Sequence, residues 1–278
     1  MSSELGVRSS KTKYSEPRTN DSELLKKQMG LYPKSIFLLM GERGLLFEFG
    51  DEISHEVNEK VRRVALAIRT EAIEGIVEIV PTYRSLLIIY NPLILSIDEL
   101  KKRLQWIEKK LQQAPFPEPK LTRIPVVYGG PYGPDLDFVA EYHQISPDEV
   151  IRLHCKQPYF IYMIGFMPGF PYMGELPEGL VTPRLKTPRL SVPTGSVAIA
   201  QKQTGIHPME SPGGWQIIGR TPVKLFDPER EPPALLQMGD LVQFYCINEK
   251  EFKEWPNFPS PLMGEGAGGG GHWLAPPP

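Results

Sequence analysis

Residues 158–220 decide the fold of this chain, and they begin Pro158-Tyr-Phe-Ile-Tyr-Met-Ile-Gly-Phe-Met-Pro-Gly-Phe-Pro-Tyr172. Between residues 158 and 233, thirteen prolines and nine glycines alternate with short apolar runs, such as 160–164, 197–200 and 215–218. Short apolar runs bounded by turn residues are typical of buried strands in an all-β unit. This region therefore predicts a folded barrel or sandwich with rigid loops, not a linker.

Composition limits the classes of protein to consider. The 278 residues are 41% hydrophobic, enough for one large or two ordinary domains. A formal net charge of -2 gives no electrostatic reason to expect nucleic acid or an anionic membrane as a partner. Cys155 and Cys246 provide no disulfide framework, and no short-spaced Cys/His pair predicts a metal site. The longest apolar runs are too short to span a bilayer, so we expect a cytoplasmic protein.

The first half of the chain predicts an α+β domain at 34–128, preceded by a disordered extension at 1–33. Ser96-Ile-Asp-Glu99 has the pattern of a helix capping box. After one extra strand, the element order β-α-β-β-α-β matches a ferredoxin-like split βαβ unit. Its strands are expected at 36–40, 45–49, 76–80, 86–90 and 121–128, and its helices at 53–72 and 97–111.

The second half predicts a β-rich domain at 129–255 with two leading helices. The second of these helices is expected to start at Ser146, with Pro147 at the first helical position, and to run through His154. A final strand is expected at 241–247. Residues 256–278 form a low-complexity tail that we do not expect to add to the core.

Several unusual strings in this β unit resemble the family that contains KipI, the 5-oxoprolinase B subunits and the allophanate hydrolase subunit 1 domain. The resemblance extends over about 34–248 and rests on Gly165-Phe-Met-Pro-Gly-Phe-Pro171, Pro183-Arg-Leu-Lys-Thr-Pro-Arg189, Val192-Pro-Thr-Gly-Ser196, Gln203-Thr-Gly-Ile206, Ser211-Pro-Gly-Gly-Trp215, Ile218-Gly-Arg-Thr-Pro222 and Gly239-Asp240. It implies a cyclophilin-like β-barrel. It also implies an ATP-dependent 5-oxoprolinase, assembled with subunits A and C, that opens 5-oxo-L-proline to L-glutamate. His207 departs from the tyrosine that we expect in the family.

Arg184 and Arg189 are the first candidate catalytic residues. Each follows a proline, which fixes its own backbone φ and biases the residue before it to an extended conformation. Two arginines held in this way could clamp the 5-oxoproline carboxylate or the phosphate of an activated intermediate. The alternative is that each arginine pairs with a nearby carboxylate or carbonyl group.

His154 is the third candidate catalytic residue. At the end of the capped helix it could act as a general base or proton carrier. The alternative is a histidine that interacts with the helix dipole.

The remaining candidates would bind substrate. Gly213 and Gly214 could offer backbone amides to an oxyanion or the lactam oxygen, or simply form a turn before a core Trp215. Phe166 could form the edge of a pocket or plug the barrel. The other substrate-binding candidates lie in the shared strings: Pro168, Gln203, His207 and Arg220.

Three functions follow from the resemblance. The first is the oxoprolinase subunit; since no Gly-x-x-x-x-Gly-Lys-Ser/Thr string is present, the ATP would be bound mainly by a partner. The second is a regulatory inhibitor that binds a sensor histidine kinase. The third is a component of an allophanate or urea-carboxylase pathway.

Overall fold

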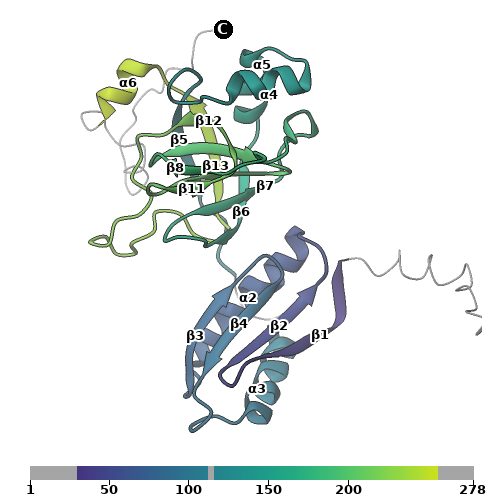
Figure 1. Cartoon of the computed structure of the whole chain (residues 1–278). Helices are drawn as coiled ribbons and strands as arrows, with labels where there is room; N and C mark the ends of the chain where they lie inside the picture. The colour runs from purple at the N-terminus through teal and green to yellow at the C-terminus, as the bar shows by residue number, and fades with distance from the viewer. Residues whose placement is uncertain (1–29, 112–115, 256–278) are drawn as a thin grey trace, which may run out of the picture.

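The computed structural model describes residues 30–111 and 116–255, which form an α+β structure in two parts (Figure 1). The first part is an open sheet with two helices. The second part is a closed barrel of seven strands. The expected α+β class with a β-barrel in the second half is confirmed.

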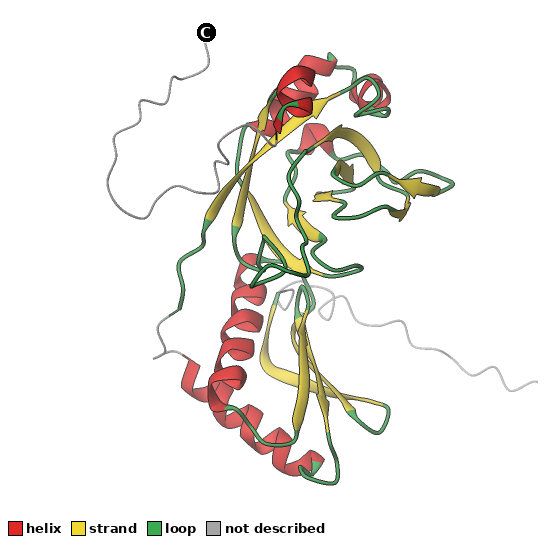
Figure 2. Cartoon of the chain, turned by 90° about the vertical axis from the view of Figure 1, so that its left-hand side faces the viewer, coloured by secondary structure: helices red, strands yellow, loops and turns green. Residues whose placement is uncertain are grey.

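The open sheet is antiparallel and has the strand order β1-β2-β4-β3. Its two helices lie on one face (Figure 2). Alternate residues of β2, among them Phe47 and Phe49, are fully buried, because successive side chains of a strand point to opposite faces. The elements are β1 (Leu31–Met40), β2 (Gly44–Gly50), α2 (His55–Glu71), β3 (Ile76–Pro81), β4 (Ser85–Tyr90) and α3 (Ile97–Lys110).

Two expectations for this part are wrong. The strand at 121–128 does not close the N-terminal sheet, since it pairs with two barrel strands. The edge beside β2 is occupied by β1, the extra strand in front. The expected extension at 1–33 is also too long, because β1 already begins at Leu31; residues 1–29 lie outside the described residues, as does the tail at 256–278.

The barrel closes in the order β10-β7-β6-β13-β5-β12-β9. A parallel pairing of β5 with β13 joins its first and last strands in the chain. The strands are β5 (Leu121–Tyr128), β6 (Tyr159–Ile164), β7 (Pro171–Gly174), β9 (Ser196–Ala200), β10 (Gln203–Ile206), β12 (Gln216–Arg220) and β13 (Leu241–Cys246).

Smaller elements surround the barrel. A ribbon of two strands, β8 (Arg189–Val192) and β11 (Ser211–Gly213), forms a separate sheet. The helices α4 (Leu136–His143) and α5 (Pro147–Cys155) pack together at one end of the barrel (Figure 1). A 3₁₀ turn, η2 (Glu178–Leu180), and a final helix, α6 (Glu249–Lys253), complete the described chain.

Helix α2 joins the two parts. The side-chain amide of Asn58, fully buried, donates to the backbone oxygens of Tyr83 (3.0 Å) and Tyr162 (2.9 Å). One turn further on, the guanidinium of Arg62 lies 5.8 Å from the ring centre of Phe160 in the barrel. A side chain at Gly239 would collide with this arginine, so the glycine permits the close approach. These contacts fix the side of the barrel that faces the N-terminal sheet.

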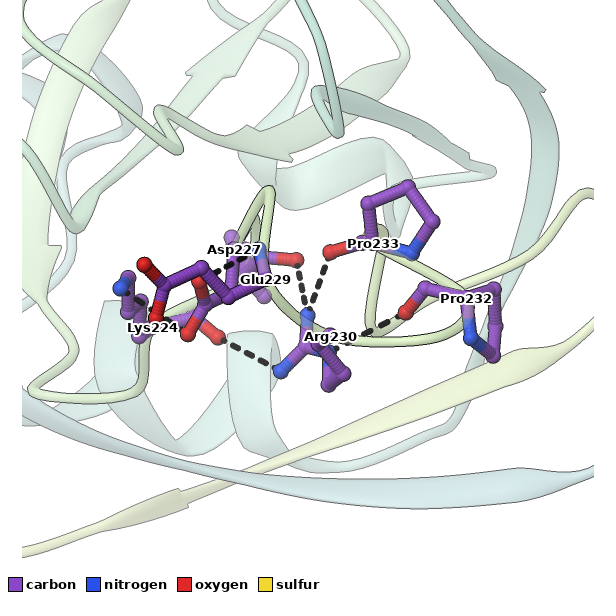
Figure 3. A network of polar contacts seen from close by, with 7 residues as sticks. Lys224, Asp227, Glu229, Arg230, Pro232 and Pro233 are labelled. Atoms are coloured by element: carbon purple, nitrogen blue, oxygen red, sulfur yellow. Dashed lines mark hydrogen bonds and ion pairs between the residues drawn. The ribbon is translucent and has the colours of Figure 1, made fainter.

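The long connection from β12 to β13 is ordered by one arginine (Figure 3). The guanidinium of Arg230 donates to the backbone oxygens of Leu225 (2.9 Å) and Pro233 (2.8 Å), and at longer distance to those of Lys224 and Pro232. Five donors in a rigid plane let a single arginine satisfy several carbonyl groups of a loop that has no regular structure.

No helix in the part of the chain that the structure describes is long and apolar enough to cross a membrane.

Candidate active site

Aromatic side chains gather around Trp215, at the point where the ribbon meets the barrel. The Trp215 ring lies edge-on to Phe170 (5.7 Å between ring centres) and to Tyr172 (5.9 Å). Phe170 also contacts the rings of His207 (5.2 Å) and Phe166 (5.9 Å). Trp215, Phe170 and His207 are themselves buried, and Trp215 and Phe170 belong to a small hydrophobic core, so Trp215 has the core position that the sequence left open as an alternative. We call these residues, together with Arg184, the Trp215 surface. The sequence strings around 166–172 and 203–215 meet here because β7 pairs with β10, which leads directly to His207.

Arg184 is the charged group of this surface. Its guanidinium lies 5.9 Å from the centre of the Trp215 ring, a cation–π contact, and its residue is exposed. None of the carboxylates in the described chain pairs with it. An arginine fork held against an aromatic ring, with its donors open, suits a carboxylate or phosphate ligand.

Tyr83 brings the N-terminal part to the same surface. Its ring lies edge-on to Tyr172 (5.7 Å), and its hydroxyl accepts a hydrogen bond from the side-chain amide of Gln203 (2.9 Å). The pKa of both tyrosines is raised, chiefly by burial. The positive charge of Arg184 offsets a part of this rise in each case. Arg184 thus acts electrostatically on hydroxyls from both parts of the molecule. Sequence analysis identified Gln203 and Arg184 but not the two tyrosines, because nothing in the sequence links 83 to 172.

Arg189 does not share the open environment of Arg184. Its guanidinium forms an ion pair with Asp135 (2.6 Å), whose other oxygen accepts from the backbone amide of Ile217 (2.6 Å). Asp135 is buried, and it therefore ties the start of α4 to both the ribbon and the barrel. Pairing with a carboxylate is the alternative that the sequence left open for each arginine, but Asp135 lies 54 positions away in the chain. Of the two arginines, only Arg184 is left without a carboxylate partner among the described residues, and the two-arginine clamp stays a prediction.

Gly213 lies against His207 of the Trp215 surface, and Gly214 lies against the loop that carries Arg184. A side chain at Gly213 would approach the His207 ring to 3.1 Å, and the oxygen of Gly214 accepts from the backbone amide of Leu185 (2.8 Å). The His207 ring bonds to the hydroxyl of Ser211 (3.0 Å), and burial lowers its pKa to about 4. Gly214 therefore holds the loop that carries Arg184, and the role of both glycines as oxyanion donors stays a prediction.

The remaining predicted binding residues are Phe166, at the edge of the Trp215 surface, Pro168 and Arg220. Phe166 and Pro168 lie on an exposed turn, in which the Phe166 side chain is 66% exposed. The Nε of Arg220, at the end of β12, donates to the backbone oxygen of Thr194 in the turn before β9 (2.7 Å), which holds that arginine to the turn. Binding of substrate by these three residues stays a prediction.

His154 lies inside the barrel, among core residues that do not belong to the Trp215 surface. Its Nδ1 bonds to the hydroxyl of Tyr128 (2.8 Å) and its Nε2 to that of Thr204 (3.0 Å). Thr204 donates its proton to the oxygen of Ala198, so His154 carries its proton on Nε2 and accepts from Tyr128. Complete burial lowers the pKa of His154 to about 3. This geometry favours a structural role, and proton transfer by His154 stays a prediction.

A groove between the two parts adjoins Gln203. It has a volume of about 490 Å³ and includes Tyr162, Glu175 and Lys202 among its lining residues. It provides both signs of charge next to the Trp215 surface, which a small zwitterionic or anionic ligand could use. Sequence analysis missed Glu175 and Lys202, since neither belongs to a recognisable motif. Within residues 30–111 and 116–255, no three His, Cys, Asp or Glu side chains come together as a metal site.

Comparison with known proteins identifies the family. The domain family described as "Carboxyltransferase domain, subdomain C and D" matches residues 36–236. The 5-oxoprolinase B subunit of Bacillus subtilis is 39% identical over 223 residues, which cover 77% of this chain and 93% of that protein. The 5-oxoprolinase B subunit of Escherichia coli O157:H7 is 42% identical and covers 77% and 95%. The chain belongs to the family of 5-oxoprolinase B subunits. The resemblance found in the sequence is confirmed.

Solved structures share this fold. The crystal structure of TTHA0988 superposes with a TM-score of 0.67 at 36% identity, over 79% of this chain and 41% of that one. The chain thus spans about two fifths of the length of that protein. The urea amidolyase of Kluyveromyces lactis gives a TM-score of 0.64 at 22% identity over 80% of this chain and 15% of that one, a likeness of fold.

Proposed function

We propose that this chain is the B subunit of an ATP-dependent 5-oxoprolinase, which acts with subunits A and C to open 5-oxo-L-proline to L-glutamate. The observation that carries the proposal is the identity of 39% and 42% to two 5-oxoprolinase B subunits, over more than nine tenths of their lengths. On the same grounds we assign the barrel to the cyclophilin-like type and the N-terminal sheet to the ferredoxin-like type.

The Trp215 surface is our proposed substrate site. 5-Oxoproline carries one carboxylate on a compact lactam ring. Arg184 would bind that carboxylate, or the phosphate of an activated intermediate, and the aromatic residues Trp215 and Tyr172 would face the ring. Opening a stable amide ring needs activation, which ATP would supply. Since this sequence has no phosphate-binding loop, we assign ATP binding mainly to a partner subunit.

The experiment is 5-oxoproline-dependent ATP hydrolysis by this chain alone, by subunits A and C alone, and by all three together. We expect turnover only in the full mixture. Equal turnover without this chain would contradict the proposal. It would favour the regulatory alternative, which inhibition of histidine kinase autophosphorylation would then test.

The urea-carboxylase alternative has one observation in its favour, the description of the matched domain family. The urea amidolyase of Saccharomyces cerevisiae is, however, only 25% identical, and this chain covers 14% of it. The same three-component assay with urea or allophanate in place of 5-oxoproline separates the two functions. We expect no ATP hydrolysis with either compound.

A further inference from the structure

The two cysteines of this chain lie side by side, although 91 positions separate them in the sequence. The Sγ atoms of Cys155, at the end of α5, and Cys246, at the end of β13, are 3.9 Å apart. Both thiols are free. The carbonyl oxygen of Cys155 accepts from the side-chain amide of Gln243 on β13 (2.6 Å), so the backbone of the helix end is fixed against the strand. The two sulfur atoms are already in contact at 3.9 Å, and a bond between them requires an approach to about 2.05 Å.

The two thiols differ in access. Cys246 is exposed, whereas Cys155 is partly buried and its sulfur lies 3.3 Å from the hydroxyl of Tyr128. The hydrogen bond from Cys155 lowers the pKa of the Cys246 thiol, and the same contact together with burial raises the pKa of the Cys155 thiol. Since the thiolate is the nucleophile in disulfide exchange, an external disulfide would react first at Cys246.

We propose that Cys155 and Cys246 are a modification site, at which an intrachain disulfide forms by exchange with a small-molecule disulfide such as oxidised glutathione. The Cys246 thiolate attacks one sulfur of glutathione disulfide, breaks its S–S bond and releases one glutathione thiolate. Cys155 then attacks the Cys246 sulfur of the mixed disulfide and releases the second glutathione. Two electrons and two protons pass from the protein thiols to two glutathione molecules, so the exchange balances.

The disulfide would join the end of α5 to the last barrel strand without disturbing the interior. Tyr128 donates its only proton to Nδ1 of His154, so this bond does not depend on the Cys155 thiol. Oxidation removes the Cys155 proton but leaves the bond between Tyr128 and His154 in place. The native barrel therefore accommodates both forms, and a cross-link over so long a loop lowers the entropy of the unfolded chain.

The test is peptide mapping under non-reducing conditions after the full chain is incubated with oxidised glutathione. We expect a cross-linked pair of peptides that contains Cys155 and Cys246, with the loss of two hydrogen atoms and no retained glutathione. The oxidised protein should also unfold at a higher temperature than the reduced protein.

Two variants check the order of the steps. Cys155→Ser should stop at a stable mixed disulfide on Cys246, and Cys246→Ser should remain reduced under the same conditions. Wild-type protein that keeps both thiols, retains glutathione on Cys246, or forms only disulfides between chains would overturn the proposal. The wild-type peptide map decides this outcome even if a variant fails to fold.

Discussion

The barrel interior around His154 and the Trp215 surface each contain a buried histidine with a lowered pKa. They differ in whether their polar groups have partners within the protein. In the interior, both ring nitrogens of His154 have hydroxyl partners. On the surface, Arg184 contacts an aromatic ring and no carboxylate of the described chain. A satisfied network adds stability and specificity to a fold, whereas an open cation over an aromatic wall is available to a ligand. We therefore expect His154 to contribute to stability, and we propose that the second region binds substrate.

The largest expected effect is on stability in acid. Burial lowers the pKa of His154 to about 3 and that of His207 to about 4, from 6.5. Below pH 6.5 the unfolded chain binds protons that the folded chain does not, so the free energy of unfolding decreases as the pH is lowered. The decrease continues down to about pH 4 for His207 and about pH 3 for His154. Each histidine contributes about 1.4 kcal/mol per pH unit, or about 5 kcal/mol for both between pH 6.5 and 4.5. Urea denaturation at several pH values measures the slope.

The matched control for this slope is His207→Tyr, which removes one titrating ring and keeps an aromatic side chain. It should reduce the slope by about half. A wild-type free energy of unfolding that stays constant between pH 6.5 and 4.5 would show that these rings are accessible to protons in the folded state.

The next effect concerns the anchor beneath the Trp215 surface. Asp135→Ala leaves the Arg189 guanidinium and the Ile217 amide without their acceptor. We expect the free energy of unfolding to fall by about 3 kcal/mol, a value at the lower end for a buried pair because Arg189 is partly exposed. Asp135→Asn keeps an oxygen for Ile217 and should lose less. Denaturation midpoints measure both losses, and equal losses would show that the hydrogen bond from Ile217 to Asp135 adds no stability.

The smallest effect concerns the contact between the two parts. Tyr83→Phe removes the hydroxyl that accepts from Gln203 and keeps the ring against Tyr172. The expected loss of stability is about 1 kcal/mol, typical of one hydrogen bond. Gln203→Ala is the reciprocal change, and the double variant should be no less stable than the worse single variant. Fully additive losses would mean that the two side chains do not interact.

Local patterns predict most of the elements correctly. The side chains of Ser96 and Ser146 accept from the backbone amides of Glu99 and Glu149, as the two capping patterns predict. The expected start of α2 is wrong by two residues, because Ser54 caps this helix and the first helical residue is His55. A helix cap depends on residues within a few positions of each other, so it can be predicted from the local sequence.

Local patterns do not predict which segments pair when they lie far apart in the sequence. The apolar pattern of 121–128 fits an edge of the N-terminal sheet as well as the barrel, and its parallel partner begins at Leu241. Two side-chain contacts also join segments that are far apart in the chain. They are the ion pair of Arg189 with Asp135 and the ring contact of Tyr83 with Tyr172. Sequence motifs identify Arg184 and Arg189 equally, and only their contacts distinguish the open arginine from the paired one.

The central claim is that Arg184 on the Trp215 surface binds substrate. The most direct test is the rate of 5-oxoproline-dependent ATP hydrolysis by the three-component mixture that contains Arg184→Ala. The matched control is Lys186→Ala, which removes an exposed cation from the same loop. We expect the Arg184 variant to fold normally and lose about a hundredfold in kcat/KM, as for the loss of one charge-stabilising donor, while the Lys186 variant stays within about twofold. A folded Arg184→Ala protein with full activity would contradict the claim.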